Sequence, residues 1–373
     1  MHIGIVGYEA NIENRVGVNT YAFELLWALY NLEDSGKNYT IYLPNQPRKD
    51  LPPQRNNWSY KILPGRGLWL ITRLMPHLFL TKDKPDILFS PSHYIPPIAP
   101  MACACSIMDL GYLDFSTHLK VYDFWQLKLW SAWSLLVAKY VFAISESTKQ
   151  EIVNHYPFAK GKVTVTPLGY DSKRFNTSLS DQKVILVKQK YGIKGNYILF
   201  LSTLKPSKNI VGLIDAWKMR EMRFPRSSLV IAGKKGWLYN DIFRKVRENN
   251  LESRIIFTDF VDEDDKPYLV KGAQVFILPS FWEGFGLDAL TAMACGVPVI
   301  VSNRGSLPEV VGSAGILVDP KNVESIADAI TKVLSMDKKD YNSIVTKGIS
   351  QAEKFSWKKT AEKTLEVLER IKK

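Results

Sequence analysis

A single carboxylate, Glu283, lies between aromatic residues and glycines in the segment FWEGFG, residues 281–286. An apolar run of strand formers precedes it at residues 275–278, and a helix pattern follows from Leu287 and ends at Gly296. Such a loop favours oxyanions and phosphates, because free N–H groups point outward and glycine lets a ligand approach the backbone. A carboxylate there accepts hydrogen bonds from hydroxyls, so the segment predicts a sugar phosphate or sugar nucleotide ligand. The alternative is an ordinary turn whose glycines serve only the backbone.

Two further polar residues follow predicted strands in the first half of the chain. His93 comes after a strand predicted at residues 86–90, and Asp109 after one predicted at residues 102–107. Open α/β sheets place ligand groups at the carboxyl ends of their strands, so both residues are candidates for a site. Asp109 has the alternative role of capping the loop that follows it.

The composition is globular and limits the classes of partner. Of the 373 residues, 46% are hydrophobic, and no run approaches the roughly 20 apolar residues of a membrane span. The first residues read as a strand, so we expect no signal peptide. The three cysteines fit neither a disulfide framework nor a zinc site, which indicates a reducing cytosol. A net charge of +12 suits anionic ligands or anionic lipid, whereas no nucleic-acid motif is evident.

Strand and helix patterns alternate along the chain and restart after its middle. Strands are predicted at residues 3–6, 39–43, 86–90, 102–107, 141–144, 163–167, 197–202, 228–232, 254–257, 275–278 and 299–302. Helices are predicted at residues 19–30, 122–137, 210–217, 241–249 and 287–295, from Ser145 as a cap, and from Val323 onward. Residues 176–182 are polar and read as a linker, and residues 303–318 as a loop. The pattern predicts an α/β protein of two doubly wound Rossmann-like domains facing each other across a cleft.

The apolar segment at residues 67–80 is too short to span a bilayer. We expect a helix packed on the sheet and kinked at Pro76, with contact to a membrane surface as the alternative. The basic and aromatic segments at residues 66–84 and 120–133 face either a lipid surface or a soluble glycan.

The segment around Glu283 resembles the donor-site motif of the retaining family-4 glycosyltransferases, also called glycosyl transferases group 1. The matching letters are PSxxEGFGL from Pro279 and AMACGVPV from Ala292. Shorter matches follow the family order over most of the chain, and bacterial mannosyltransferases are among the members it resembles. These matches are Gly17 to Tyr21, Leu25-Leu26, Asp109-Leu110, Ile144 to Glu146, Pro167 to Gly169, Lys208-Asn209, Ala232-Gly233, Ser302-Asn303, Leu307 to Val310 and Val318 to Pro320.

The resemblance implies the GT-B fold and transfer of a hexose, mannose or glucose, from a nucleoside diphosphate sugar with retention at the anomeric carbon. Catalytic roles fall on Glu283, Asp109 and Lys208. The donor would contact Gly17, Ser202, Lys205, Ser207, Lys208, Phe260, Val261, Glu283, Gly284, Phe285, Gly286, Leu287 and Thr291. The acceptor or sugar region would hold His93, Met108, Asp109 and Ser145. In the family's proposed mechanism the leaving phosphate takes the acceptor proton, and neither a metal nor a cofactor is expected.

The resemblance also implies a division of labour along the chain. Residues 1–178 would form the acceptor-binding domain and residues 179–355 the donor-binding domain. Residues 356–373 would form a helix that crosses back toward the first domain. The acceptor would be a glycan or a lipid-linked glycan in polysaccharide biosynthesis. The expected location is the cytoplasm, with peripheral contact to the anionic inner face of the membrane and no binding of nucleic acid.

Several positions depart from the family pattern. Thr291 stands where members usually have a second glutamate that holds the ribose. A hydroxyl contributes roughly 0.5–1.5 kcal/mol to a hydrogen bond, against roughly 1.5–3 for a charged partner. Ser207 replaces a usual arginine, Lys205 a common acidic residue, Met108 a common histidine and Ser202 a common glycine. Two alternatives therefore stand beside an active transferase: a GT-B protein that binds a sugar nucleotide or glycan with little turnover, and a GT-B enzyme of another class, such as an epimerase or phosphorylase.

Overall fold

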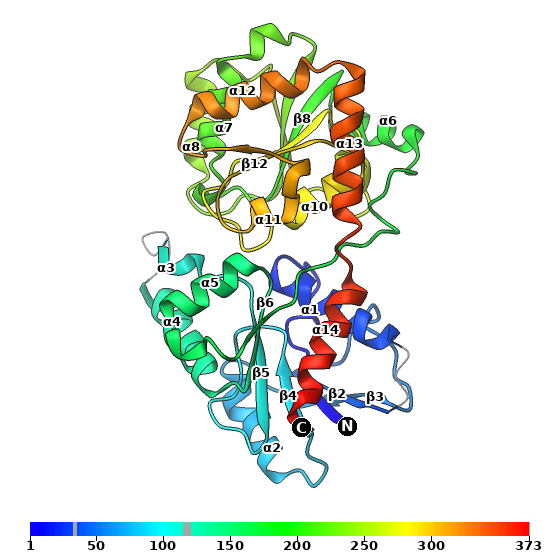
Figure 1. Cartoon of the computed structure of the whole chain (residues 1–373), viewed down its shortest axis with the longest axis vertical. Helices are drawn as coiled ribbons and strands as arrows, with labels where there is room; N and C mark the ends of the chain where they lie inside the picture. Colours follow the sequence, from blue (N-terminus) through cyan, green and yellow to red (C-terminus); the bar gives the residue numbers. More distant parts are fainter. Residues whose placement is uncertain (33–35, 115–120, 373) are drawn as a thin grey trace. The chain divides into compact units, whose positions relative to one another are not determined.

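The computed structural model describes residues 1–32, 36–114 and 121–372, and it divides into two compact units (Figure 1). One unit joins residues Met1–Gly169 to the C-terminal segment from Ser356, and the other is Tyr170–Phe355. The chain thus passes between units at Gly169, whereas the sequence placed the boundary after residue 178. Within the described residues, no helix has both the length and the apolar character needed to cross a membrane.

The N-terminal unit contains a sheet of seven parallel strands in the order β3-β2-β1-β4-β5-β6-β7. The strands are β1 (His2–Val6), β2 (Asn38–Leu43), β3 (Trp58–Ile62), β4 (Ile87–Ser90), β5 (Ala102–Ile107), β6 (Tyr140–Ala143) and β7 (Val163–Val165). All but β3 were predicted from the sequence. Strand β3 lies at the sheet edge and alternates buried with more exposed residues, so it lacks the continuous apolar run of the others.

Helices cover both faces of this sheet (Figure 1). They are α1 (Val18–Asn31), α2 (Met75–Leu80), α3 (Gly111–Asp114), α4 (Val121–Val137), α5 (Glu146–His155) and α14 (Trp357–Glu369), with short turns η1 (Leu70–Leu74), η3 (Pro157–Ala159) and η7 (Arg370–Lys372). Helices α1 and α14 pack on each other. On the other face, residues of α2, α4 and α5 join one core cluster, including Leu78, Leu135 and Ile152.

The segment at residues 67–80 packs on the sheet, as preferred from the sequence. Leu74 and Leu78 are fully buried in the core. The segment is not one kinked helix, however, because a π-helical turn, η1, runs into α2 at Met75. Pro76 lies in the first turn of α2, where a missing N–H group leaves no helical hydrogen bond unmade.

The second unit contains six parallel strands in the order β10-β9-β8-β11-β12-β13. The strands are β8 (Asn196–Leu201), β9 (Ser227–Ala232), β10 (Ile255–Asp259), β11 (Val275–Leu278), β12 (Val299–Ser302) and β13 (Ile316–Val318). Its helices are α6 (Asp181–Lys190), α7 (Ile210–Lys218), α8 (Asn240–Glu248), α9 (Lys266–Lys271), α10 (Leu287–Ala294), α11 (Leu307–Val311), α12 (Val323–Leu334) and α13 (Lys338–Ala352), with turns η4 (Pro206–Lys208), η5 (Glu221–Arg223) and η6 (Gly312–Ala314).

Two predictions for this unit were wrong. The linker predicted at residues 176–182 overlaps α6, whose start is capped by Ser180 accepting from the N–H group of Lys183. The loop predicted at residues 303–318 contains α11 and β13. Both segments are short and rich in Ser, Gly or Pro, so local composition hid the elements that tertiary packing stabilises. Helix α9 was also missed.

Candidate active site

The strongest ionic contact near the predicted motif joins Glu283 to Lys208. Lys208 Nζ lies 2.5 Å from Glu283 Oε1, and Ser280 Oγ donates to the same oxygen at 2.7 Å. Only 11% of the lysine side chain and 12% of the glutamate side chain are exposed. Both donors bind Oε1, so Oε2 has no hydrogen-bond partner among the described residues. The pair is therefore fixed in place and still presents an acceptor oxygen to a ligand.

Parallel pairing brings the loops that carry this pair together. Strand β11 lies between β8 and β12, so the loops at their carboxyl ends are neighbours. Phe281 donates its N–H group to the carbonyl oxygen of Ser207 at 2.9 Å. Ser306 binds the carbonyl oxygen of Glu283 twice, through N at 3.2 Å and Oγ at 2.9 Å. The loops after β8 and β12 thus hold the loop that carries Glu283.

Gly305 allows the loop after β12 to approach the backbone of Glu283 closely. Its φ is +58°, and a Cβ atom there would lie 2.5 Å from the carbonyl oxygen of Glu283. The sequence placed Ser280 in the motif without a role of its own, and sequence reasoning missed Gly305 and Ser306. A Gly-Ser pair just before a helix was the available signal, but only the sheet order shows that it lies beside Glu283.

Lys208 is placed by a tight turn after β8. It ends the 3-10 turn η4, and Asn209 follows in the left-handed conformation with φ of 55° before α7 begins. The Asn209 side chain donates to the carbonyl oxygen of Pro320 at 2.6 Å, which fixes the turn to the segment after β13. The lysine is 9% exposed as a residue, so its position is set by packing as well as by charge.

The N-terminus of α10 lies directly after the Glu283 loop. Gly286 is its cap residue, with φ of 92°, and a Cβ atom there would approach Leu307 Cδ2 to 2.4 Å. Only glycine meets both demands without strain. Ala289 and Leu290 donate their N–H groups to the carbonyl oxygen of Gly286, at 3.0 and 3.2 Å. The N–H groups of Leu287 and Asp288 come before these bonds and are available to a phosphate.

A second carboxylate, Asp288, lies in the first turn of α10 and was not predicted from the sequence. Burial raises its pKa to about 6, against the opposing effect of Lys208 and Lys266, and the charge of Glu283 raises it further. The site therefore contains two interacting carboxylates near one buried lysine.

Thr291, in the position of the family's second glutamate, is turned toward its own helix. Its hydroxyl donates to the carbonyl oxygen of Asp288 at 2.9 Å, and the residue is 6% exposed. The hydroxyl proton is therefore already used, so toward a ligand the oxygen can act only as an acceptor.

The remaining predicted donor residues surround this cluster in different ways. The backbone of Ser202 is fixed at both ends. Its N–H group donates to the carbonyl oxygen of Ala232, and its carbonyl oxygen lies so close to Gly233 that a Cβ atom there would be 2.0 Å away. Lys205 lies over the ring of Trp237, 5.1 Å from the centroid. Phe260 is 47% exposed after β10, whereas Val261 is 1% exposed and belongs to the core.

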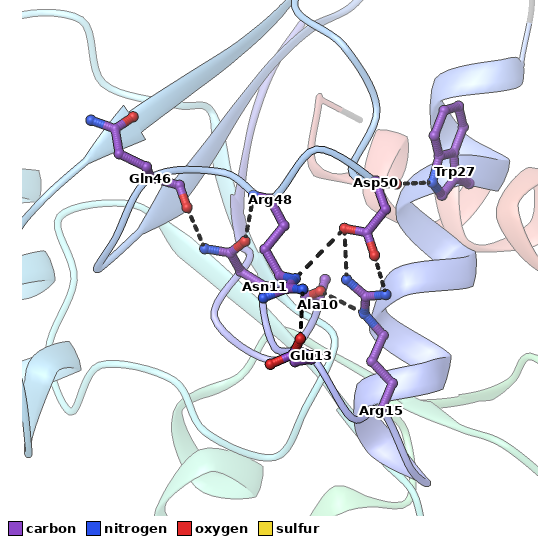
Figure 2. A network of polar contacts seen from close by, with 8 residues as sticks. All are labelled: Ala10, Asn11, Glu13, Arg15, Trp27, Gln46, Arg48 and Asp50. Atoms are coloured by element: carbon purple, nitrogen blue, oxygen red, sulfur yellow. Dashed lines mark hydrogen bonds and ion pairs between the residues drawn. The ribbon is translucent and has the colours of Figure 1, made fainter. Parts of the chain in front are cut away.

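In the N-terminal unit, the loop before Gly17 is held by a polar network (Figure 2). Arg15 binds Asp50 through two nitrogens, at 2.7 and 3.1 Å, and donates to the carbonyl oxygen of Ala10 at 2.9 Å. Asn11 donates to the carbonyl oxygen of Gln46 and accepts from the N–H group of Arg48. Gly17 itself has φ of 54° and open space where a Cβ atom would lie. That this loop contacts a diphosphate stays a prediction.

The predicted acceptor residues have structural contacts of their own. Asp109 is exposed and accepts from the N–H group of Gly111 at 2.9 Å, which is its alternative capping role. Ser145 caps α5 by accepting from Thr148, as predicted, and is 2% exposed. Thr148 in turn donates to the carbonyl oxygen of Met108 at 3.2 Å.

His93 lies at the end of β4 against Tyr94, with ring centroids 3.8 Å apart. Burial lowers its pKa to about 4, so the imidazole is neutral near pH 7. Its Nε2 is buried and has no hydrogen-bond partner among the described residues. A ligand hydroxyl would satisfy that nitrogen.

Two family models together match most of the chain. The model "Glycosyl transferases group 1" matches residues 184–351, and "Glycosyltransferase Family 4" matches residues 16–174. The two parallel Rossmann-like sheets are those of the GT-B fold. The chain belongs to the family-4, group 1 glycosyltransferases, as the motif around Glu283 predicted.

Relatives with described activities are mannosyltransferases and related enzymes. The chain is 35% identical over 237 residues to O-antigen chain mannosyltransferase B of Escherichia coli, a match that covers 62% of this chain and 61% of that protein. It is 26% identical over 228 residues to mannosylfructose-phosphate synthase of Agrobacterium fabrum, covering 58% of this chain and 50% of that protein. The matched part thus spans less than two thirds of either relative.

Solved structures share the fold over nearly the whole chain. Anabaena Alr3699/HepE in complex with UDP and glucose superposes with a TM-score of 0.77 at 17% identity, covering 99% of this chain and all of that one. Sucrose-phosphate synthase from Thermosynechococcus elongatus gives 0.78 at 20% identity, covering 99% and 98%. At these identities the likeness shows the fold alone.

Proposed function

We propose that this protein is a retaining glycosyltransferase that moves a hexosyl group, with mannose favoured over glucose, from a nucleoside diphosphate sugar to an acceptor. The observation that carries the proposal is the Lys208–Glu283 pair, held by three loops beside the N-terminus of α10. A buried lysine and a helix N-terminus suit a diphosphate, and an acceptor oxygen on Glu283 suits sugar hydroxyls.

The residues divide the work as follows. Lys208 places a positive charge where negative charge develops on the leaving diphosphate. The free N–H groups at the start of α10 add to that stabilisation without moving, because Gly286 and Leu307 fix the helix start. Glu283 Oε2 accepts from donor hydroxyls and orients the sugar. No side chain is asked to act as nucleophile, and the leaving phosphate takes the acceptor proton. We propose that neither a metal nor a cofactor takes part.

Mannose is supported by the relative with 35% identity, which is named as an O-antigen chain mannosyltransferase. We propose a glycan or lipid-linked acceptor in polysaccharide synthesis on the same ground. The reaction would take place in the cytoplasm, where nucleotide sugars are made, at the inner face of the membrane. His93 and Asp109 remain the proposed acceptor-side residues, because Asp109 is exposed after β5 and the buried Nε2 of His93 has no hydrogen-bond partner among the described residues.

The test is a thermal-shift screen of UDP, GDP, ADP and their sugar conjugates, with conjugate hydrolysis followed in the same wells. A ligand at about 100 times its dissociation constant stabilises by roughly 2.7 kcal/mol. We expect one base to raise the melting temperature and its conjugate to be hydrolysed slowly. If the melting temperature rises but no hydrolysis is seen, even with polysaccharide acceptors added, the result favours the alternative of a GT-B protein that binds a sugar nucleotide with little turnover. No shift with any nucleotide contradicts the proposal.

Glu283→Gln gives the mutational test. The variant keeps the shape and one oxygen of the side chain but loses its charge, so donor hydrolysis or transfer should fall at least about 100-fold. Nucleoside diphosphate binding should persist, because Lys208 no longer has a counter-charge. Ser280→Ala removes only the neighbouring hydroxyl and should cost far less. Near-normal turnover of the glutamine variant would refute the placement of the donor sugar.

A further inference from the structure

The exposed side of α4 carries many apolar residues. Among the α4 residues whose burial the structure describes, which leave out residue 123, those that are exposed are all hydrophobic. We call them the α4 face: Val121, Tyr122, Trp125, Leu129, Trp133, Leu136 and Val137. Trp125, Leu129 and Trp133 follow one another at intervals of four residues, so they form a stripe along one side of the helix. Leu129 is 62% exposed and Trp125 is 50% exposed.

The polarity of α4 is inverted relative to an ordinary surface helix. Ser131 and Ser134 are buried, at 2% and 0% exposure, on the side that carries Leu135 into the sheet core. A surface helix usually turns its polar residues outward. Trp125 and Leu129 add little to the core of this unit, because at least half of each residue is exposed. The α4 face is therefore shaped for contact with something outside the unit.

The chemistry of the α4 face and its surroundings matches an anionic membrane surface. Tryptophan and tyrosine are the side chains enriched at the membrane–water interface. Lys128 lies over the ring of Trp125, 5.0 Å from the centroid, where its ammonium can reach lipid phosphates while its stem covers apolar surface. Helix α2, on the same side of the sheet, ends with exposed Phe79 and Leu80.

Basic residues outnumber acidic ones in the two segments that carry these apolar side chains. Residues 66–84 and 121–140, which include α2 and α4, hold six Lys or Arg and two Asp. Lys82, Lys84 and Lys139 are exposed. A second copy of this chain would bring two such basic surfaces together, which charge repulsion disfavours, whereas an anionic bilayer complements them.

We propose that the α4 face docks on an anionic phospholipid bilayer, with α4 lying in the plane of the interface. The opposite side of α4 supports a functional reason. Trp130 packs edge-on against Tyr94 at 5.1 Å between centroids, and its indole donates to the carbonyl oxygen of Ile95. The docking helix thus contacts the segment that holds His93. This inference rests on the proposed function only in that a lipid-linked acceptor would be presented beside that histidine.

The test is co-sedimentation of the full-length chain with vesicles of phosphatidylcholine alone and of phosphatidylcholine mixed with phosphatidylglycerol. We expect binding to the anionic vesicles and a loss of at least about tenfold in the double variant Trp125→Gln, Leu129→Gln. The matched control is Ile185→Gln, Leu186→Gln, which removes two exposed apolar side chains from α6 and should bind normally. Lys82→Glu with Lys84→Glu should weaken binding to anionic vesicles only.

Three outcomes overturn the proposal. In the first, the unaltered chain does not bind anionic vesicles. In the second, the Trp125 and Leu129 double variant binds them as well as the unaltered chain does. In the third, the chain is a dimer in solution and the double variant is a monomer. Nucleotide thermal shifts of the same variants, measured without vesicles, show whether the fold and donor site are intact. Vesicle binding is measured without donor, so failure of this proposal and failure of the glycosyltransferase proposal are seen separately.

Discussion

At the residue scale, one buried ion pair decides how the site is arranged. A buried pair is costly to desolvate, so its presence in a loop cluster calls for a reason beyond stability. Hydrogen bonds from Ser280, Phe281 and Ser306 further constrain the loops that carry this pair. An exposed surface turn would not need these hydrogen bonds. This constraint matches a site that must be rigid before its ligand arrives.

Lys208→Ala should weaken the binding of nucleoside diphosphates far more than the binding of nucleosides. A charged hydrogen bond contributes roughly 1.5–3 kcal/mol, so diphosphate affinity should fall by roughly ten- to a hundredfold. Titration calorimetry with UDP or GDP and the matching nucleoside would measure both losses. Lys218→Ala serves as control, because Lys218 pairs with Glu221 at 3.7 Å and belongs to no predicted donor contact. An equal loss for nucleoside and diphosphate would mean that Lys208 is not at the phosphates.

Asp288 should make stability depend on pH. Burial raises its pKa from the ordinary value of 3.8 to about 6 in the folded chain, so the folded state holds the proton more tightly. Stability therefore falls as pH rises from about 4 through 6, and the loss is complete above that range. Asp288→Asn should restore about 1–3 kcal/mol at pH 7.5 and little at pH 4. Urea unfolding at both pH values measures this, and an equal gain at both would contradict the assignment.

At the element scale, the C-terminal helix α14 completes the N-terminal unit. Thr360 Oγ1 donates to the carbonyl oxygen of Pro167 at 2.6 Å, and Lys37 pairs with Glu369 at 2.6 Å. Tyr21 of α1 lies against Trp357, with ring centroids 6.1 Å apart. A segment from the end of the chain is thus part of the fold built by its beginning.

Gly169→Ala should destabilise this attachment. A Cβ atom at Gly169 would lie 2.0 Å from the backbone nitrogen of Trp357, so the start of α14 must move. Overpacking of this kind costs typically about 1–3 kcal/mol. Gly161→Ala is the matched control, since nothing lies within 4 Å of its Cβ position. Chemical denaturation followed by tryptophan fluorescence would show the difference, and equal midpoints would show that the contact is not tight.

At the scale of the whole molecule, the two units have separate sheets and separate cores. The Lys208–Glu283 cluster belongs entirely to the second unit, as do α10 and the loops that hold it. The α4 face and the His93 segment belong to the first. This division agrees with the proposal that one unit binds the donor and the other meets the acceptor.

Hydrogen exchange with a nucleoside diphosphate should report this division. Protection should be greatest in residues 203–209 and 281–291, because these amides lie in the proposed phosphate and sugar site. Added protection at residues 8–17 would support the predicted role of the Gly17 loop. Mass spectrometry of peptides measures this protection with and without the nucleoside diphosphate, and the matching nucleoside serves as the control. Protection restricted to the N-terminal unit would contradict the donor assignment.

The sequence by itself determined the class of fold, most strands and the core of the site. Strands buried on both faces, such as β11 and β12, show as continuous apolar runs, and the motif around Glu283 carries its own local signal. Elements without such runs, β3, α6, α9, α11 and β13, escaped because packing rather than local preference stabilises them. Only the tertiary structure decided which side chains meet. Lys208, Ser280 and Ser306 reach Glu283 because the sheet order places the ends of β8, β11 and β12 side by side, and the outward α4 face appears only once its opposite side is buried.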